Sequence, residues 1–386
     1  MSASNLSRGE YARRYDRARE LMKTENMNAL FVTGEENFTY FTGSRSTMPW
    51  LSFTRPRFAI IPLEGDPIVV VHDANREETR KGSIVRDVRV YEASEQLPLG
   101  SSPIDMLAEI FREKGLDKGH VGAELGLEQR LGFPCGDFLG LKSTLPDTIF
   151  VDASDLLWDL RIVKSKEEIS SIRKACQITA KARQKCFETI EQGMTEKQVA
   201  NLFFQYMMEA GADKPCFVMV VSGTFSESTY RPTNKRLRKG ETVFLDGGCY
   251  IGDYTCDFDR IATVGRPSEK QVVLHDFIYE TNKKMMAEYK PGVKLSDIAD
   301  ICWREYEKAG LPISKAGRAG HGQGMLPTEP PSVSKLDSTV LKPGMVVSSE
   351  PGLITDSGLF VWEDVLAVTK DGHELLSKET PQLIRI

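Results

Sequence analysis

Residues 237–248 (LRKGETVFLDGG) and residues 341–352 (LKPGMVVSSEPG) are near copies of one another. Both carry Leu, a basic residue, Gly, Val, a carboxylate and a final Gly at the same spacings, and the carboxylates are Asp246 and Glu350. The segments at 193–211 and 292–310 also repeat, in the same order, with helix-like spacing of apolar residues. The C-terminal part of the chain is therefore predicted to be an internally duplicated α+β unit, with two helices and then strands in each half.

Each repeat continues into a second acid beyond a turn-forming Gly and Asp. In the first repeat, a hairpin is expected to place Asp246 opposite Asp257, and in the second to place Glu350 opposite Glu363. Opposite residues have Cβ atoms only about 4.5–5.5 Å apart. Two carboxylates at that distance repel unless a proton or a metal lies between them. Four carboxylates around one point predict a site for divalent cations.

His321 is the histidine that the sequence singles out for this site. It lies in the glycine-rich segment 317–324 (GRAGHGQG), between the two acidic hairpins, and glycines permit close backbone approach to a ligand. The other four histidines are expected at surface or capping positions. Two ions about 3.5–4 Å apart can polarise a carbonyl and activate water together. Either Glu350 or Glu363 can then accept the proton of the attacking water.

The N-terminal part reads as a separate α/β domain, so the chain is predicted to have two domains, at 1–160 and 161–386. Helices are expected at 10–24 and 103–115, and strands at 29–34, 37–43 (NFTYFTG), 57–62, 66–73 and 120–125. The first helix of the second domain opens with a capping box from Ser165 to Glu168, and the next with one from Thr195 to Gln198.

Composition and charge restrict the class of protein. The net charge of −5 over 386 residues gives no general attraction to nucleic acid or to an anionic membrane. No apolar run approaches the roughly 20 residues that a membrane span requires, and the N-terminus lacks the apolar core of a signal peptide. Seven cysteines without a CxxC pair suit a reducing compartment. We expect a cytoplasmic protein.

Five motifs, LDGG, CDFDR, GHGQG, SSEPG and WED, together resemble the creatinase/prolidase/methionine aminopeptidase family. The N-terminal segment NFTYFTG is similar to its creatinase, prolidase and aminopeptidase P branch. The resemblance implies a duplicated pita-bread catalytic domain preceded by a smaller α/β creatinase-type domain. It implies two divalent ions (Mn²⁺, Co²⁺, Fe²⁺ or Zn²⁺), a homodimer, and catalytic roles for His321 and for Glu350 as the base. The ligand set that it implies is Asp246, Asp257, His321, Glu350 and Glu363.

Three positions depart from the family pattern. Proline-specific members usually have histidines where this chain has Thr229 and Thr328, and those histidines hold the substrate. Arg231, beside Thr229, is a candidate substitute for binding an anionic group. Asp259 replaces a hydroxyl residue two positions after Asp257 and faces the same side of a strand. It is either an extra or outer-shell metal ligand or one half of an ion pair with a nearby cation.

The predicted function is a dinuclear-metal hydrolase that cleaves the C–N bond of a small dipeptide-like or polar amide, with atypical specificity. The alternatives are a true Xaa-Pro dipeptidase or aminopeptidase, or a relative resembling ectoine hydrolase or dimethylsulfoniopropionate lyase. A non-catalytic binding protein is disfavoured by the complete ligand set. Trp50, Phe53 and Arg55 are candidates for substrate contact across a dimer, with core packing of the aromatics and exposure of Arg55 as the alternative.

Overall fold

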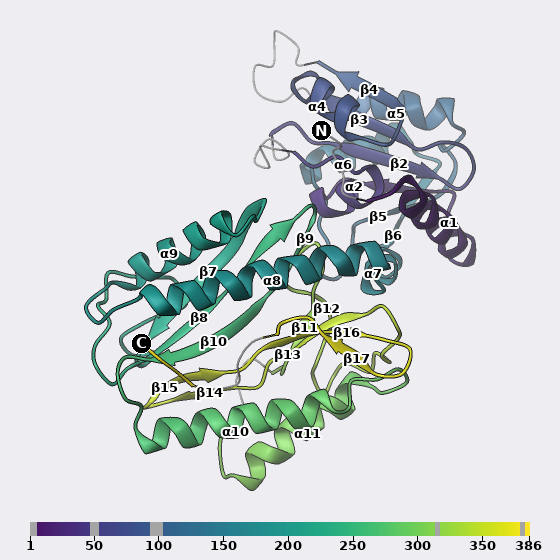
Figure 1. The fold of residues 1–386 in the computed structure, drawn as a ribbon. Helices are drawn as coiled ribbons and strands as arrows, with labels where there is room; N and C mark the ends of the chain where they lie inside the picture. Colours follow the sequence, from purple (N-terminus) through teal and green to yellow (C-terminus); the bar gives the residue numbers. More distant parts are fainter. Residues whose placement is uncertain (1–5, 47–53, 93–102, 313–316, 379–382) are drawn as a thin grey trace. The chain divides into compact units, whose positions relative to one another are not determined.

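The chain folds into two compact units, Met1–Arg161 and Ile162–Ile386, in the computed structural model drawn in Figure 1. The structure describes residues 6–46, 54–92, 103–312, 317–378 and 383–386. Among these residues, no helix is both long enough and apolar enough to cross a membrane.

The first unit is built on a six-stranded mixed sheet in the order β4-β3-β2-β1-β5-β6. Its strands are β1 (Ala29–Val32), β2 (Phe58–Pro62), β3 (Ile68–His72), β4 (Asp87–Tyr91), β5 (Gly119–Ala123) and β6 (Thr148–Asp152). Its helices are α1 (Arg8–Thr24), α2 (Glu35–Thr42), α4 (Arg76–Gly82), α5 (Ile104–Glu113), α6 (Cys135–Thr144) and α7 (Ser154–Ile162), with a 3₁₀ turn at Asp73–Asn75. Aromatic side chains fill the core, where Phe31 stacks on Phe58 at 5.6 Å.

The segment NFTYFTG was predicted to be a strand, and this prediction is wrong. The residues form the body of helix α2, which begins after Gly34 and ends at Gly43 in the left-handed conformation. Aromatic and β-branched residues favour a strand by propensity. Here the acidic first turn, Glu35 and Glu36, and the C-terminal glycine are the local signals that favour a helix.

The second unit repeats one arrangement twice, as the duplicated sequence predicts. The first half contains α8 (Lys166–Thr189), α9 (Glu196–Glu209), β7 (Lys214–Ser222), β8 (Thr242–Ile251), β9 (Tyr254–Thr255) and β10 (Phe258–Thr263). The second half contains α10 (Glu269–Met286), α11 (Leu295–Lys308), β11 (His321–Gly322), β12 (Glu329–Ser332), β13 (Val346–Ser349), β14 (Gly352–Thr355), β15 (Gly358–Val361), β16 (Asp364–Val368) and β17 (His373–Leu375). Strand β18 (Ile384–Arg385) pairs with β10.

The strands of this unit lie between the two helix pairs (Figure 1). One sheet has the order β18-β10-β8-β7, the other has the order β12-β11-β13-β16-β17, and β14 and β15 form a two-stranded ribbon. Both predicted capping boxes are present, at the starts of α8 and α9. The acids of the repeat lie in the middle of β8 (Asp246), directly after β13 (Glu350) and directly before β16 (Glu363).

The register of the first hairpin differs from the prediction. Asp246 lies opposite Asp259, not opposite Asp257, because the turn is centred between Gly252 and Asp253 and Ile251 pairs with Tyr254. The sequence analysis placed the centre of the turn one residue earlier in the chain. That shift of one residue changes the residue opposite Asp246 by two positions, from Asp257 to Asp259. Since side chains alternate with a period of two, this error keeps Asp257 and Asp259 on the same face.

The second hairpin has the predicted register. Thr355 pairs with Gly358 and Ser349 pairs with Asp364, so the chain turns midway between Glu350 and Glu363. Glu350 and Glu363 therefore lie opposite one another on neighbouring segments of the hairpin.

A buried arginine connects the two halves. The guanidinium of Arg260, on β10, donates through Nη1 to the backbone carbonyls of Asp259 (2.7 Å) and Glu363 (2.6 Å). Its Nη2 donates to Asp364 Oδ1 at 2.8 Å, and the group lies 4.0 Å from the ring centroid of Trp362. Asp364 also accepts from the Trp362 indole and from Asn282. One side chain thus fixes the distance between the two acid-bearing strands.

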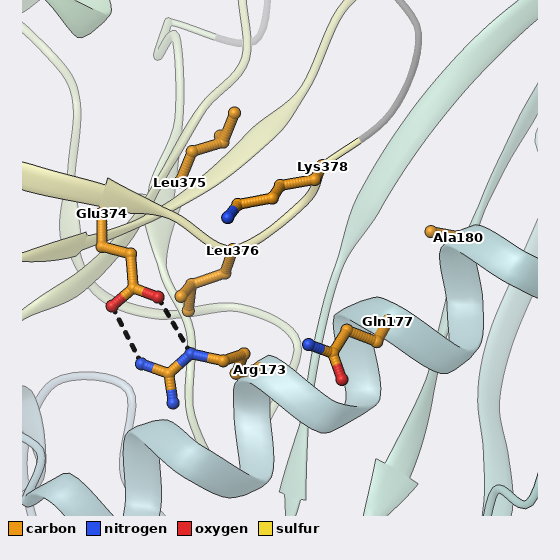
Figure 2. Close-up of a pocket in the computed structure, with 7 residues that line it drawn as sticks. All are labelled: Arg173, Gln177, Ala180, Glu374, Leu375, Leu376 and Lys378. Carbon is orange, nitrogen blue, oxygen red and sulfur yellow. Dashed lines mark hydrogen bonds and ion pairs between the residues drawn. The ribbon is translucent and has the colours of Figure 1, made fainter.

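A second ion pair joins α8 to β17 nearer the surface. Arg173 donates to both carboxylate oxygens of Glu374, at 3.0 and 2.9 Å, beside a small pocket (Figure 2). Both side chains are about one third exposed or more, so this pair contributes little to stability despite its two-point geometry.

We predict that Arg260→Met lowers the free energy of unfolding by about 3 kcal/mol, because the substitution leaves Asp364 buried without its cation. Urea denaturation of the metal-free protein measures the change. Arg238→Met is the matched control, since Arg238 forms an exposed ion pair with Glu227. The control is expected to cost less than about 1 kcal/mol. Equal effects of the two substitutions would show that Arg260 does not hold the halves together.

Candidate metal centre

Six side chains from the duplicated strands of both halves converge on one site. Asp246 lies on β8, Asp257 immediately before β10, and Asp259 within β10. His321 begins β11, Glu350 follows β13, and Glu363 precedes β16. Asp246 lies in the middle of its strand and the other five lie at strand ends or next to them, so the sheets determine their positions.

His321 is the hub of the cluster. Its Nε2 lies 3.7 Å from Asp257 Oδ2, 3.7 Å from Glu350 Oε2 and 3.5 Å from Glu363 Oε1. Its Nδ1 lies 3.1 Å from the carbonyl oxygen of Gly322, which can only accept, so the ring proton is on Nδ1. Burial lowers the pKa of His321 to about 4. The imidazole is therefore neutral near pH 7 and directs the Nε2 lone pair at the acids, as a metal ligand does.

Four of the acids are buried and Glu350 is half-buried, and removal from water raises the pKa values of all five. Burial raises the pKa of Asp246 to about 6 and, with the charge of Asp246, the pKa of Glu350 to about 7. Burial and the neighbouring carboxylates raise the pKa values of Asp257, Asp259 and Glu363 further above their usual range. So many carboxyl groups cannot all be ionised at this distance without a cation.

Several of these buried oxygens lack a hydrogen-bond partner among the described residues. They are Asp246 Oδ1, Asp257 Oδ1, both oxygens of Asp259, and Glu363 Oε1. A buried polar atom without a partner is rare, and an ion is one of the few explanations. Two groups bring one donor atom of each residue within 4.8 Å of the others: Asp257, His321 and Glu363, and Asp259, Glu350 and Glu363. The donor set of carboxylates and one imidazole fits divalent ions such as Mn²⁺ or Zn²⁺.

Side chains outside the cluster fix the ligand backbones. Gln323 forms a reciprocal pair with Asp257, donating Nε2 to its carbonyl at 2.7 Å and accepting from its N–H at 3.0 Å. Ser348 accepts from the backbone N–H of His321 at 3.1 Å. The sequence analysis named neither residue. Gln323 could have been found, since it is a polar side chain two residues after the ligand histidine in a glycine-rich segment.

A cavity of about 530 Å³ opens onto the cluster. One end is lined by Asp246, Asp257, His321 and Glu350, and Arg318 is the cation among its described lining residues. The rest of the wall is largely apolar and comes from β7, β8 and the β14–β15 ribbon: Met219, Phe244, Leu353, Ile354, Leu359 and Val361. The volume suits a small ligand with both polar and apolar parts.

The predicted substrate-contact residues differ in their placement. Thr328 lines the cavity. Thr229 and Arg231 are exposed, and the Thr229 hydroxyl donates to the Arg231 carbonyl at 3.2 Å. Neither is among the described lining residues, whereas Tyr230 between them is. The sequence analysis missed Tyr230, although an aromatic residue between two singled-out positions was a usable signal.

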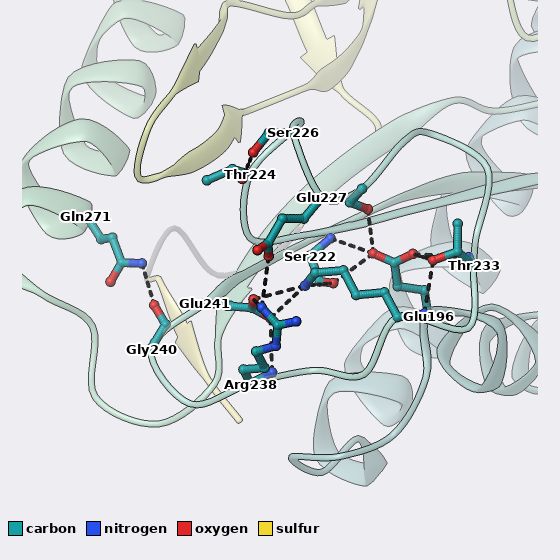
Figure 3. Close-up of polar contacts among 12 residues, drawn as sticks. Glu196, Ser222, Thr224, Ser226, Glu227, Thr233, Arg238, Gly240, Glu241 and Gln271 are labelled. Carbon is teal, nitrogen blue, oxygen red and sulfur yellow. Dashed lines mark hydrogen bonds and ion pairs between the residues drawn. The ribbon is translucent and has the colours of Figure 1, made fainter.

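A buried carboxylate holds the loop that carries Tyr230. Glu196, the first residue of α9, is fully buried and accepts from the N–H and hydroxyl of Ser222 and of Thr233, and from the hydroxyl of Ser228 (Figure 3). These contacts lie on both sides of Tyr230 in the chain. Glu196 thus fixes both ends of the loop, and Phe225 packs edge-on against the Tyr230 ring at 5.0 Å.

The three candidates of the aromatic-rich segment lie in the N-terminal part of the chain. Trp50 and Phe53 lie outside the described residues, and Arg55 is half-buried in the first unit. The charge of Arg55 contributes to lowering the pKa of His72 there, after burial.

Comparison with known proteins adds to this geometry. Residues 170–370 match the model of metallopeptidase family M24, and residues 14–163 match the creatinase/prolidase N-terminal domain. An Xaa-Pro dipeptidase from Pyrococcus horikoshii is 33% identical over 263 residues, which are 67% of this chain and 74% of the relative. An uncharacterized peptidase, YqhT, from Bacillus subtilis is 27% identical over 373 residues, 96% of this chain and 99% of the relative.

Solved structures of prolidases and Xaa-Pro dipeptidases have a similar fold. The prolidase from Pyrococcus horikoshii OT3 has a TM-score of 0.80 and 28% identity, and the alignment covers 96% of this chain and 100% of that one. An Xaa-Pro dipeptidase from Bacillus anthracis has a TM-score of 0.83 at 23% identity, covering 97% and 100%, which shows the fold alone. The predicted fold, a duplicated pita-bread domain after a smaller α/β creatinase-type domain, is confirmed.

We predict that the metal-free protein becomes less stable as the pH rises from 7 to 8.5. Carboxyl groups of the unfolded chain are already deprotonated there, whereas the folded cluster still holds protons because its pKa values are raised. The folded state therefore binds more protons than the unfolded state, and its stability must fall with rising pH. Thermal unfolding after chelation and dialysis measures the effect.

Addition of Mn²⁺ is expected to raise the unfolding temperature more at pH 8 than at pH 6, because the ion competes with protons for the carboxylates. Glu350→Gln is the control, since it removes one titrating acid and should flatten the pH dependence of the metal-free protein. An unfolding temperature that rises from pH 7 to 8.5 in the metal-free wild type would contradict the assignment of protons to the cluster.

Proposed function

The chain belongs to metallopeptidase family M24, a family of metal-dependent hydrolases, and from this premise we propose that it hydrolyses the C–N bond of a small amide with two divalent ions. The observation that carries the proposal is the buried cluster of acids and one neutral imidazole, several of whose oxygens lack a hydrogen-bond partner among the described residues. The cluster opens onto a cavity of about 530 Å³.

Five residues would hold the ions: Asp246, Asp257, His321, Glu350 and Glu363. The burial of Asp246, Asp257, His321 and Glu363, the convergence of all five and the tautomer of His321 support this assignment. Bound Mn²⁺, Co²⁺, Fe²⁺ or Zn²⁺ ions would polarise the scissile carbonyl and increase the acidity of the attacking water.

Glu350 is the proposed proton carrier. Its side chain is 31% exposed, compared with 1% for Glu363, so it faces the substrate end of the cavity. A carboxyl group with a pKa near 7 can accept the proton of water and return it to the leaving nitrogen at neutral pH. Glu363, fully buried behind it, is less suited to exchange protons with a substrate.

The cavity wall supports a substrate of dipeptide size. The apolar ribbon β14–β15 can contact a side chain or ring, while Arg318 can pair with an anionic group. We propose that the specificity differs from that of proline dipeptidases, because Thr229 and Thr328 stand where those enzymes usually have histidines. A threonine hydroxyl is neutral and shorter than an imidazolium. Contact of Thr229, Arg231, Arg55 and Trp50 with the substrate stays a prediction.

A true Xaa-Pro dipeptidase is the second candidate function. It is favoured by the match at 33% identity to the Xaa-Pro dipeptidase of Pyrococcus horikoshii and by the fold similarity to a prolidase of that organism. The two candidates share the metal centre and differ in the residues that bind the substrate.

We also propose that residues 1–160 and 161–386 act as separate domains and that the chain forms a homodimer, as the family resemblance implies. Sedimentation velocity at micromolar concentration is expected to give the mass of a dimer. A fully active monomer would exclude a site shared between chains.

Steady-state kinetics on the metal-loaded protein, with Xaa-Pro dipeptides, other dipeptides and small polar amides, test the function. We expect turnover of a non-proline amide and weak cleavage of Xaa-Pro, since loss of one hydrogen-bond donor typically costs about 10²–10³ in rate. Thr328→His should increase Xaa-Pro cleavage, because Thr328 lines the cavity.

His321→Ala and Glu350→Ala serve as controls and should abolish turnover of any substrate while the circular dichroism spectrum is retained. Xaa-Pro turnover of the wild type at ~10 s⁻¹ or more, typical of enzymes, would favour the second candidate. No turnover of any amide with any of the four metals would exclude both.

A further inference from the structure

The duplication assigns a symmetric partner to Asp259. Asp246 and Asp259 are thirteen residues apart, as are Glu350 and Glu363. Asp246 faces Asp259 across the first hairpin, and the second hairpin turns midway between Glu350 and Glu363. The counterpart of Glu363 in the first half is therefore Asp259, and Asp257 is the additional acid.

Asp259 has the burial and the unsatisfied atoms expected of a ligand. The residue is 0% exposed, and both carboxylate oxygens lack a hydrogen-bond partner among the described residues. A buried carboxyl group with neither oxygen bonded costs folding free energy in either protonation state. A purely structural role would not leave both oxygens unsatisfied.

The carboxylate of Asp259 lies among the acids of the other half. One of its oxygens is within 4.8 Å of an oxygen of Glu350 and an oxygen of Glu363. Arg260 Nη1 donates to the backbone carbonyls of both Asp259 and Glu363, so the two backbones are held together by one donor group. The three carboxylates therefore approach one point from three strands, β10, β13 and β16, and from both halves of the unit.

An ion pair with a cation is the competing explanation. Arg260 and Arg183 are near enough for their charges to oppose the rise in the pKa of Asp259. Arg260 donates to backbone carbonyls and to Asp364, and Arg183 donates to the carbonyl of Phe258. Neither arginine donates to a carboxylate oxygen of Asp259. Arg260 and Arg183 thus offset part of the negative charge of Asp259 without a hydrogen bond to its carboxylate. Both carboxylate oxygens of Asp259 are left available to an ion.

We propose that Asp259 is a direct ligand of the ion held by Glu350 and Glu363, an inference that rests on the metal centre of the proposed function. The centre then offers five carboxylates and one imidazole. An extra carboxylate favours ions that prefer many oxygen ligands, such as Mn²⁺, over Zn²⁺, which prefers four-coordinate sites with nitrogen and sulfur donors. Asp259 is thus a residue that determines which metal the site selects.

Calorimetric titration of the metal-free full chain with MnCl₂ and with ZnCl₂ tests the proposal on wild type and Asp259→Asn. The amide is nearly isosteric but neutral. We expect Asp259→Asn to weaken binding of one Mn²⁺ ion by at least about tenfold, and to weaken Zn²⁺ binding less, so that the preference for Mn²⁺ falls. Asp356→Asn is the matched control, because Asp356 is an exposed acid in the turn of the second hairpin.

Two further measurements separate the explanations. A crystal structure of the Mn²⁺-loaded wild type should show a carboxylate oxygen of Asp259 on the ion, and a water molecule between them would overturn the inference. Circular dichroism shows whether Asp259→Asn folds. If it does not, Asp259→Ala is used in the titration instead. The inference is also overturned if Asp259→Asn binds Mn²⁺ and Zn²⁺ with the same affinities as the wild type. Metal binding by a wild type that hydrolyses no amide would instead refute the proposed function alone.

Discussion

The guanidinium of Arg260 is the interaction on which the arrangement of the second unit depends. It donates to the carbonyls of Asp259 and Glu363 and to the carboxylate of Asp364, which belong to different halves of the duplicated unit. Two hairpins that each carry acids would otherwise separate, because their carboxylates repel. Arg260 binds the backbone carbonyls of Asp259 and Glu363, whose side chains belong to the acidic cluster. The hydrogen bonds of Arg260 to the backbone thus keep the acid-bearing strands together although their carboxylates repel one another.

This construction has an energetic consequence. Burial raises the pKa values of the acids, so without an ion the folded protein retains protons that the unfolded chain has lost at neutral pH. Ions that displace these protons bind the folded state selectively, and such binding stabilises it. The neutral His321 adds a nitrogen donor without adding charge. Folding and metal binding are thus linked through the same residues.

Most of the architecture of the second unit could be predicted from the sequence because this unit is duplicated. Matching spacings in the two repeats identified the strands and the acids, and a two-residue error in the first hairpin did not change the face that Asp257 and Asp259 share. Propensity failed for NFTYFTG, where terminal glycines and early acids favour α2. Arg260 was missed because its role depends on contacts between distant segments, which no local pattern reports. Gln323 and Tyr230 had local signals, their places beside His321 and between Thr229 and Arg231, but their roles too depend on contacts with distant segments.

The number of ions bound per chain tests the central claim most directly. Elemental analysis of the protein, reconstituted separately with Mn²⁺, Fe²⁺, Co²⁺ and Zn²⁺ and then freed of excess metal, gives this number. The convergence of carboxylates from both halves predicts about two ions per chain when the site is filled. No bound ion with any of the four metals would contradict the claim that the duplicated hairpins form a metal centre.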